Sequence, residues 1–93
     1  MEHAICAAIQ GKQIVSFTYK GVRRSGEPHA LFIDQDGDLT LSVWQTSGGK
    51  GPGWRDFHVS KLTAFATGPA TFARPRQDYN LSAKKPRRII CSL

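Results

Sequence analysis

The sequence lacks the features that mark a membrane or secreted protein. It has no run of about 18 apolar residues that could span a bilayer. Its start, MEHAICAAIQGKQ, also lacks the basic region and long apolar core of a signal peptide. Cysteine is scarce, with Cys6 and Cys91 near opposite ends of the 93 residues. We therefore expect a cytoplasmic protein without membrane contact, in which a reducing environment keeps both cysteines as free thiols.

Motifs for metal binding and catalysis are also absent. The cysteines and the three histidines form no CxxC or HExxH spacing, which argues against a metal site. Asp34, Asp36 and Asp38 alternate, but they lie in a predicted tight turn, where Asp is common, and lack the continuation of an EF-hand loop. There is no paired-carboxylate or Ser-His-Asp spacing. We therefore expect neither an enzyme nor a bound cofactor.

The net charge of +6 is unevenly distributed along the chain. Residues 1–66 hold seven Lys and Arg against six Asp and Glu, whereas residues 67–93 hold six Lys and Arg against Asp78 alone. A basic end on a near-neutral body is typical of proteins that contact phosphate groups, although a solvated, solubilising end fits the charge equally well. The densest cluster is a basic tail formed by Lys84, Lys85, Arg87 and Arg88.

Hydrophobic periodicity predicts one short helix followed by five strands. Residues 2–10 place Ile5, Ala8 and Ile9 on one helical face, and Gly11 follows as a stop. After the helix, apolar and polar residues alternate, which is the pattern of half-buried strands. In chain order we expect a strand at 13–20, a turn at 21–28, a strand at 29–33, an Asp-Gly hairpin at 34–38, a strand at 39–45, a glycine-rich loop at 46–53, and strands at 54–59 and 62–67.

The glycine-rich loop, TSGGKGPG, does not match a phosphate-binding P-loop. A P-loop leads from a strand into a helix and has Ser or Thr after its lysine, whereas here Gly51 follows Lys50 and a strand follows the loop. The loop is therefore predicted to be a flexible hairpin connection. The strand after it places Arg55, Phe57 and Val59 on one face. Arg55 is then expected at the rim of the core, where it can meet an anion.

This order of elements is typical of a small, strongly curved antiparallel barrel. An OB barrel would normally carry a helix between its third and fourth strands, where this chain has the glycine-rich loop. We therefore expect a mainly β protein, a five-stranded antiparallel SH3-like barrel of Sm-like type with a short N-terminal α-helix. The barrel domain is assigned to residues 1–80 and the tail to residues 81–93, in which Pro86 interrupts any regular helix or central strand.

Several stretches together resemble the WYL domain family. They are AAIQGKQIVSFTYKG, GEPHAL, WRDFHVSKL and ARPRQDYN, and their order and spacing carry the resemblance. Arg55 matches the first arginine of the family pattern, whereas His58 and Lys61 stand where further arginines are usual. Residues 39–41, Leu-Thr-Leu, occupy the place of the naming tripeptide. The resemblance implies an Sm-like barrel with a basic ligand pocket. It also implies a link to bacterial transcriptional regulators and phage-defence systems, several of which sense single-stranded nucleic acid or nucleotides.

The candidate ligand-binding residues combine cations with aromatic and imidazole rings. Trp44 and Trp54 are expected on outward faces, where they stack on a base, pack in an interface, or are covered by the helix or the C-terminal tail. Tyr19 is either a core aromatic or a ligand contact, and the histidines are either hydrogen-bonding surface residues or ligand contacts. The complete set is Tyr19, His29, Trp44, Arg55, His58, Lys61, Arg74 and Arg76, together with the basic tail.

Two functional hypotheses follow from these observations. The first is a non-catalytic regulatory module that binds an anionic ligand, either single-stranded nucleic acid or a nucleotide, through Arg55, Lys61 and nearby aromatics. The second is a protein–protein interaction scaffold that forms a homodimer or docks on a transcriptional regulator. The apolar end IICSL motivates the second hypothesis, because it would dock on its own barrel or on a second subunit.

Overall fold

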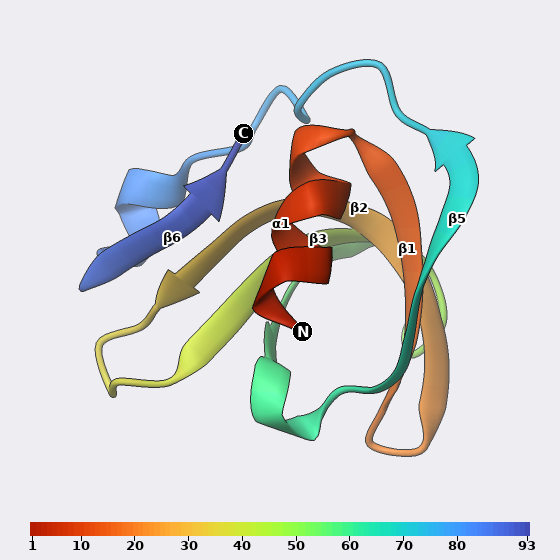
Figure 1. The fold of residues 1–93 in the computed structure, drawn as a ribbon, viewed down its shortest axis with the longest axis horizontal. Helices are drawn as coiled ribbons and strands as arrows, with labels where there is room; N and C mark the ends of the chain where they lie inside the picture. The colour runs from red at the N-terminus through yellow and green to blue at the C-terminus, as the bar shows by residue number, and fades with distance from the viewer.

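An N-terminal helix packs on a six-stranded antiparallel sheet in the computed structural model, which describes residues 1–93 (Figure 1). In chain order the elements are α1 (Glu2–Gln10), β1 (Gln13–Tyr19), β2 (Val22–Ile33), β3 (Leu39–Ser47), β4 (Gly53–His58), the 3₁₀ turn η1 (Val59–Lys61), β5 (Thr63–Thr71), a second 3₁₀ turn η2 (Leu81–Lys84) and β6 (Arg88–Ser92). The sheet order is β4-β3-β2-β1-β5, and β6 pairs with β2. The expected helix and the mainly β class are confirmed.

The sheet is not closed into a barrel. One edge of β2 pairs with β1 through Val22–Gly26 and then with β6 through Ala30–Ile33, while β3 pairs along the other edge. The strands β4 and β5 end the sheet and do not pair with each other. The expected closed barrel is therefore not confirmed. The predicted number of strands is wrong, because β6 adds a sixth.

The turn predicted at residues 21–28 is wrong, because most of this stretch is strand. The chain reverses at Lys20 and Gly21, whose φ angles of 50° and 73° are those of a tight two-residue hairpin turn. Tyr19 therefore pairs directly with Val22. Gly26 and Pro28, which indicated a turn, lie inside β2, and Pro28 borders a register shift against β3.

β5 also continues past its predicted end. Gly68 and Pro69 were expected to terminate the strand, but β5 extends through them to Thr71. The outer edge of β5 has no partner strand. An edge strand tolerates proline because a missing N–H need not break the hydrogen-bonded ladder.

The core lies between α1 and the concave side of the sheet. Ile5 and Ile9 of the helix pack with Phe17, Leu41 and Phe57, all of which are buried. The rings of Phe17 and Phe57 meet edge to face, with centroids 4.9 Å apart. The inward faces predicted for these strands are thus confirmed. No helix combines the length and apolar character that a membrane crossing requires.

The segment predicted as a basic tail belongs to the sheet. β6 pairs with the second half of β2, and the backbone N–H groups of Arg87 and Leu93 extend this pairing by donating to Ile33 and His29, each at 2.9 Å. The partly buried Ile90 and Leu93 contact the core. The apolar end of the chain therefore docks on its own fold, one of the two alternatives that the sequence left open.

A disulfide joins α1 to β6. Cys6 and Cys91 are bonded, with their Cα atoms 5.9 Å apart across 85 residues of sequence. The expectation of two free thiols is therefore wrong. The pairing of β6 with β2 brings Cys91 against the helix, and sequence spacing alone did not indicate this proximity.

We expect the disulfide to be a major contribution to the stability of this small fold. Closing a loop of this length lowers the conformational entropy of the unfolded chain, which stabilises the folded state by about 4 kcal/mol at 25 °C. Replacing Cys6 and Cys91 with serine should lower the free energy of unfolding by roughly this amount in urea titrations. The wild type should lose a similar amount in dithiothreitol, whereas the serine variant should not respond to the reductant. Equal midpoints for oxidised and reduced wild type would contradict the assignment.

Candidate ligand-binding surface

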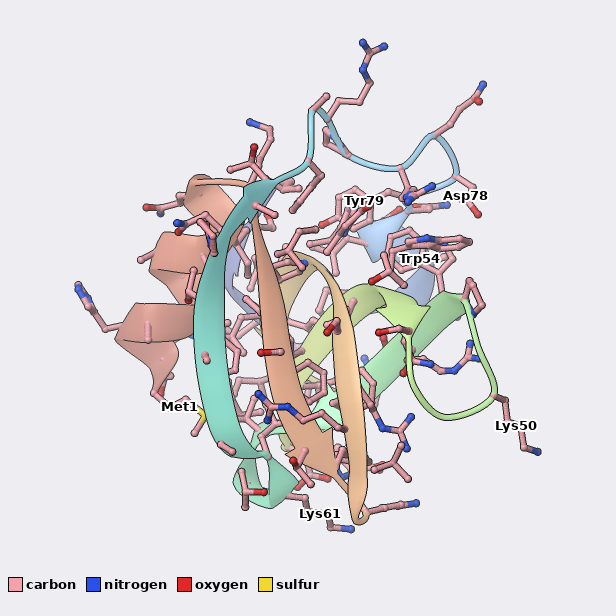
Figure 2. All side chains as sticks on the ribbon, turned by 90° about the vertical axis from the view of Figure 1, so that its right-hand side faces the viewer. Met1, Lys50, Trp54, Lys61, Asp78 and Tyr79 are labelled. Atoms are coloured by element: carbon pink, nitrogen blue, oxygen red, sulfur yellow. A yellow bond between two sulfur atoms is a disulfide. The ribbon has the colours of Figure 1, made fainter.

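The residues predicted to form one binding site lie in three regions. These are an aromatic face with His29, Trp44 and Arg76, a loop end with Tyr19 and Arg55, and a hairpin turn with His58. Figure 2 shows Lys61 well apart from Trp54 and Tyr79. Lys61 and Arg74 are exposed and form no ion pair. Arg55 lies beside the glycine-rich loop, whereas Lys61 ends η1, two residues before the Thr63 that pairs with Thr18.

The aromatic face is covered by residues 72–84, which we call the covering segment. Trp54 of β4 stacks on Tyr79 of this segment, with ring centroids 5.8 Å apart, and its Nε1 donates to Asp78 Oδ2 at 3.1 Å (Figure 2). Burial raises the pKa of Tyr79, whose hydroxyl donates to the carbonyl of His29. Of the two alternatives for Trp54, the structure thus shows coverage by the C-terminal part of the chain.

His29 anchors the covering segment and is fully buried. Its Nε2 accepts the backbone N–H of Arg76 at 3.0 Å, which places the proton on Nδ1, where it is donated to the carbonyl of Glu27 at 2.8 Å. Burial lowers the pKa of His29, so the ring is neutral at pH 7. Both ring nitrogens are occupied, and His29 is therefore a structural residue and not a ligand contact.

An ion pair between the buried Glu27 and the partly exposed Arg76 fixes the covering segment a second time. Arg76 donates to both carboxylate oxygens of Glu27, from Nε at 2.9 Å and from Nη2 at 2.8 Å. These hydrogen bonds raise the pKa of Arg76. The guanidinium also lies over the ring of Trp44, 4.7 Å from its centroid. The guanidinium of Arg76 is thus occupied by Glu27. The indole of Trp44 is half-buried at the margin of the aromatic face.

Shallow hollows border the covering segment. One, of about 330 Å³, lies between Trp54 and η2, and another, of about 500 Å³, lies beside Trp44 and Arg76. A third, of about 680 Å³, follows the segment past Arg74. The aromatic face is therefore mainly a second small core, with concave margins where rings and cations are accessible.

The loop end is free of acidic residues. Residues 3–26 and 39–55 contain no Asp or Glu, and they bring Lys20, Arg24, Lys50 and Arg55 to the same end of the sheet. The guanidinium of Arg24 and the ammonium of Lys20 lie 5.7 Å and 5.8 Å from the centroid of the Tyr19 ring. Only Arg76 and Lys84 among the lysines and arginines form ion pairs. The positive charge of the loop end is therefore uncompensated.

Gln45 ties the glycine-rich loop to both arginines. Its Nε2 donates to the carbonyls of Gly48 and Gly51 at 2.7 Å and 2.8 Å, and its Oε1 accepts from Arg24 Nη1 at 3.2 Å. Arg55 Nη2 donates to the same Gly51 carbonyl at 3.2 Å. The loop, predicted to be a flexible connection, is thus held by three hydrogen bonds from the side chains of Gln45 and Arg55.

Two glycines make room for these guanidinium groups. A Cβ on Gly49 would lie 2.7 Å from Arg24 Nη1, and a Cβ on Gly53 would lie 2.7 Å from Arg55 Nη1. Both glycines also have positive φ angles, of 51° and 149°. The glycines of the loop therefore do more than connect β3 to β4. They allow the guanidinium groups of Arg24 and Arg55 to approach the loop backbone.

Sequence reasoning missed Arg24 and Gln45 as partners of Arg55. A signal for Gln45 was present, because it continues the inward alternation of Leu41 and Val43 just before the loop. A buried amide at such a position requires hydrogen-bonding partners, and the adjacent loop carbonyls are the nearest groups available. Nothing in the sequence indicated Arg24, because its stretch was predicted to be a turn.

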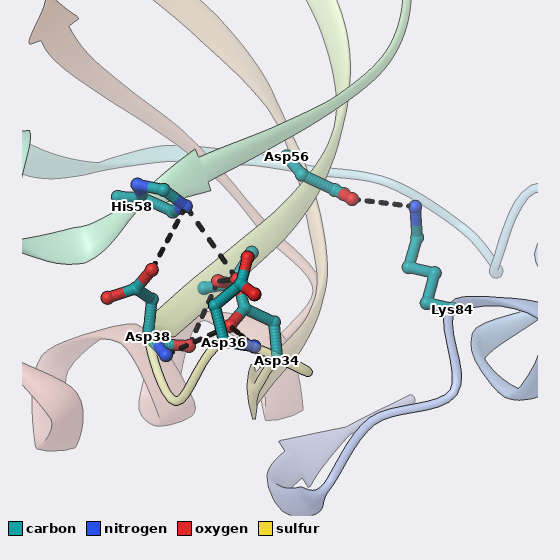
Figure 3. A network of polar contacts seen from close by, with 7 residues as sticks. Asp34, Asp36, Asp38, Asp56, His58 and Lys84 are labelled. Atoms are coloured by element: carbon teal, nitrogen blue, oxygen red, sulfur yellow. Dashed lines mark hydrogen bonds and ion pairs between the residues drawn. The ribbon is translucent and has the colours of Figure 1, made fainter.

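The remaining predicted residues lie at the hairpin turn and along the chain end. Lys84 forms an ion pair with Asp56 at 2.9 Å (Figure 3). The carbonyl of Lys85 accepts a hydrogen bond from the side chain of Gln35. Arg87 and Arg88 are exposed at the start of β6. The basic cluster is therefore built into the fold and is not a free arm.

The buried His29 should make stability depend on pH. Because the pKa of folded His29 lies below the ordinary value of 6.5, the unfolded chain takes up the proton first as the pH falls. The contribution of neutral His29 is complete above pH 6.5 and is lost as the pH falls toward the pKa of the folded state. We expect NMR titration to give a His29 pKa below 6.5. The control variant His3→Gln should lose stability at low pH as the wild type does. A folded-state pKa at or above 6.5 would refute this.

Comparisons with known proteins give no relative from which a function could be transferred. No family model matches the chain, and no match was found among curated proteins or among solved structures.

Proposed function

We propose that this protein is a non-catalytic module that binds single-stranded nucleic acid at the loop end. The observation that carries the proposal is the cationic end of the sheet, built from chain stretches without Asp or Glu, where Lys20 and Arg24 lie beside Tyr19 and Lys50 and Arg55 lie at the glycine-rich loop. Uncompensated cations attract phosphates, and adjacent aromatic rings offer surfaces on which bases stack. This combination of cations and aromatic rings favours single-stranded nucleic acid over an inorganic anion as the ligand.

Arg24 and Arg55 are prepared for phosphate contact by the way they are held. Their guanidinium groups are hydrogen-bonded to an amide oxygen and to backbone carbonyls, all of which are neutral. Their positions are thus fixed while their charge stays available. No carboxylate competes with a phosphate at this end. Lys50 extends from the tip of the loop and adds a mobile cation (Figure 2).

The tryptophan pair extends this surface. Trp44 pairs with Trp54 across β3 and β4, one position before the Gln45–Gly53 pair at the base of the loop. β4 is an edge strand, so a ligand at the hairpin end can reach both faces of the sheet. Stacking on an exposed ring contributes about 1–3 kcal/mol per base. The half-buried Trp44 is the ring placed to supply this contact.

The resemblance to WYL domains supports the same class of ligand. We propose that the chain is a divergent member whose open sheet is a variant of the Sm-like barrel, with a role in bacterial regulation. The helix followed by four consecutive antiparallel strands, with β5 returning to β1, supports this proposal. Arg55, which stands at the position of the family's first arginine, lies at the loop end.

We expect a fluorescently labelled single strand to bind with strong salt dependence. Each phosphate contact should contribute about −0.7 to the slope of log affinity against log salt. Lys50→Ala and Arg55→Ala should each reduce the magnitude of the slope by roughly this amount. The matched controls Arg87→Ala and Arg88→Ala, exposed at the start of β6, should leave the slope unchanged. Fluorescence anisotropy at several salt concentrations measures the slopes, and circular dichroism checks that the variants fold.

Two outcomes would overturn this function. Salt-insensitive binding, or equal slopes for the loop-end variants and the controls, would exclude the loop end as the phosphate contact. If a free mononucleotide at equal concentration displaced the labelled single strand, the ligand would be a nucleotide and not single-stranded nucleic acid.

A second candidate function, an interaction scaffold, is favoured by the open edge of β5. The stretch LTAFATGPATFA, residues 62–73, contains no charged residue, and Ala66 and Thr67 are exposed on it. Charged side chains ordinarily protect such edges against pairing with another strand. We propose a second copy of this chain as the partner, because an uncharged edge can pair with itself antiparallel across a two-fold axis.

The scaffold hypothesis predicts a dimer that one charged residue introduced on the edge of β5 would disrupt. Sedimentation equilibrium should show the wild type as a dimer and Ala66→Lys as a monomer, because the lysine places a charge on the pairing edge. The matched control Ala4→Lys, on an exposed position of α1, should leave the dimer intact. A wild type that stays monomeric at high micromolar concentration would exclude the edge as an interface.

A further inference from the structure

The turn between β2 and β3 meets the end of β4 at a cluster that the proposed function does not use. In the β3–β4 ladder, Thr40 pairs with His58. The imidazole therefore lies beside Asp34 and Asp38, which precede Thr40 in the turn. Figure 3 shows the three side chains converging, with His58 coming from a different strand than the two carboxylates. Chemically, they offer one nitrogen and two oxygen ligand atoms.

The spacing of these atoms suits a metal ion better than direct hydrogen bonds. His58 Nε2 lies 3.7 Å from Asp34 Oδ2 and 3.8 Å from Asp38 Oδ2, and one ligand atom from each residue lies within 4.8 Å of the others. These distances exceed those of hydrogen bonds. Ligands at tetrahedral Zn²⁺ are separated by about 3.4 Å, given metal–ligand bonds of about 2.1 Å. A small rotation of the exposed Asp38 would bring the three groups to this separation.

Asp34 is held in place for such a role. Its Oδ1 accepts the backbone N–H groups of Asp36 and Asp38, each at 2.9 Å, and its Oδ2 accepts the hydroxyl of Thr40 at 3.1 Å. Oδ2 therefore faces His58 with a lone pair left over. Hydrogen bonds of this kind orient ligating carboxylates in metal sites.

The charges around the cluster leave its carboxylates without a basic partner. Neither Asp34 nor Asp38 forms an ion pair with a lysine or an arginine, although the chain has 13 such residues. Nearby Lys84 is paired with Asp56, and Arg87 lies against Gly37 without pairing with either carboxylate. An imidazole binds metal in its neutral form, so as a ligand set the three groups would carry a charge of −2, which a divalent cation would neutralise.

We propose that Asp34, Asp38 and His58 bind one divalent transition-metal ion, with Zn²⁺ as the best fit and water in the remaining position. The nitrogen ligand disfavours Ca²⁺ and Mg²⁺, which prefer oxygen. The ion would join the β2–β3 turn to the end of β4. The site lies at the opposite end of the β3–β4 hairpin from the glycine-rich loop, so it is independent of the nucleic-acid proposal.

Calorimetric titration of the oxidised, chelator-treated protein with ZnCl₂ alone tests the site. Oxidation matters because it keeps both cysteines in the disulfide and away from the metal. We expect one Zn²⁺ per chain and a thermal midpoint that rises with free Zn²⁺, because the ion binds only the folded state. His58→Gln and Asp38→Asn should each weaken binding about tenfold or more, since each removes one ligand.

Two matched controls decide whether the assignment holds. Asp36→Asn removes a carboxylate of the same turn that is not part of the trio, and His3→Gln removes another exposed histidine. Both should retain wild-type affinity. The proposal is overturned if no Zn²⁺ binds at millimolar concentration, if His58→Gln binds as tightly as the wild type, or if His3→Gln abolishes binding. Because metal binding is measured without nucleic acid, its failure is distinguishable from failure of the proposed function.

Discussion

Along one edge, β2 pairs first with β1 and then with β6, and the rest of the structure depends on this change of partner strand. Gly26 lies at the last β1 pair and also lets β3 approach closely on the other edge, because a Cβ there would lie 2.3 Å from a methyl group of Val43. β1 leaves the edge of β2 at this point, and β6 occupies the same edge from Ala30 onward. The disulfide to α1 follows from that placement, since Cys91 lies opposite Leu31.

The same strand also organises the face turned away from α1. Glu27 and His29 lie on it two residues apart, and they hold Arg76 through its side chain and its backbone, respectively. A buried carboxylate is stable only with such a partner, so the covering segment is as necessary to Glu27 as Glu27 is to the segment. Trp54 then stacks on Tyr79 of the fixed segment, and the central parts of β2 and β3 are buried on both faces. This explains how a small chain with tryptophans on both strands of a hairpin presents little apolar surface.

The β3–β4 hairpin has opposite charge at its two ends. Its glycine-rich loop gathers arginines around Gln45, whereas its other end places His58 among the carboxylates of the β2–β3 turn. Anions and cations are thus attracted to opposite ends of one rigid element. The proposed strand-binding surface and the proposed metal site share the hairpin but no residue, and Lys84 and Asp56 between them are neutralised by their own ion pair.

The sequence by itself determined the N-terminal helix, the inward-facing residues and the glycine-rich loop, but not the extent of β2 and β5 or the existence of β6. The alternation of Phe17, Leu41 and Phe57 with polar neighbours predicted the inward faces, and GGKGPG predicted the loop, because period and turn chemistry are properties of a few adjacent residues. Only the tertiary structure decided which distant groups meet: Cys6 with Cys91, Glu27 with Arg76, and His58 with Asp34. The cysteines meet because β6 pairs with β2, and His58 meets Asp34 because of the register between β3 and β4. Neither pairing is visible in the periodicity of a single strand. For the same reason the sequence named Arg55 as a candidate but paired it with Lys61 rather than with Arg24.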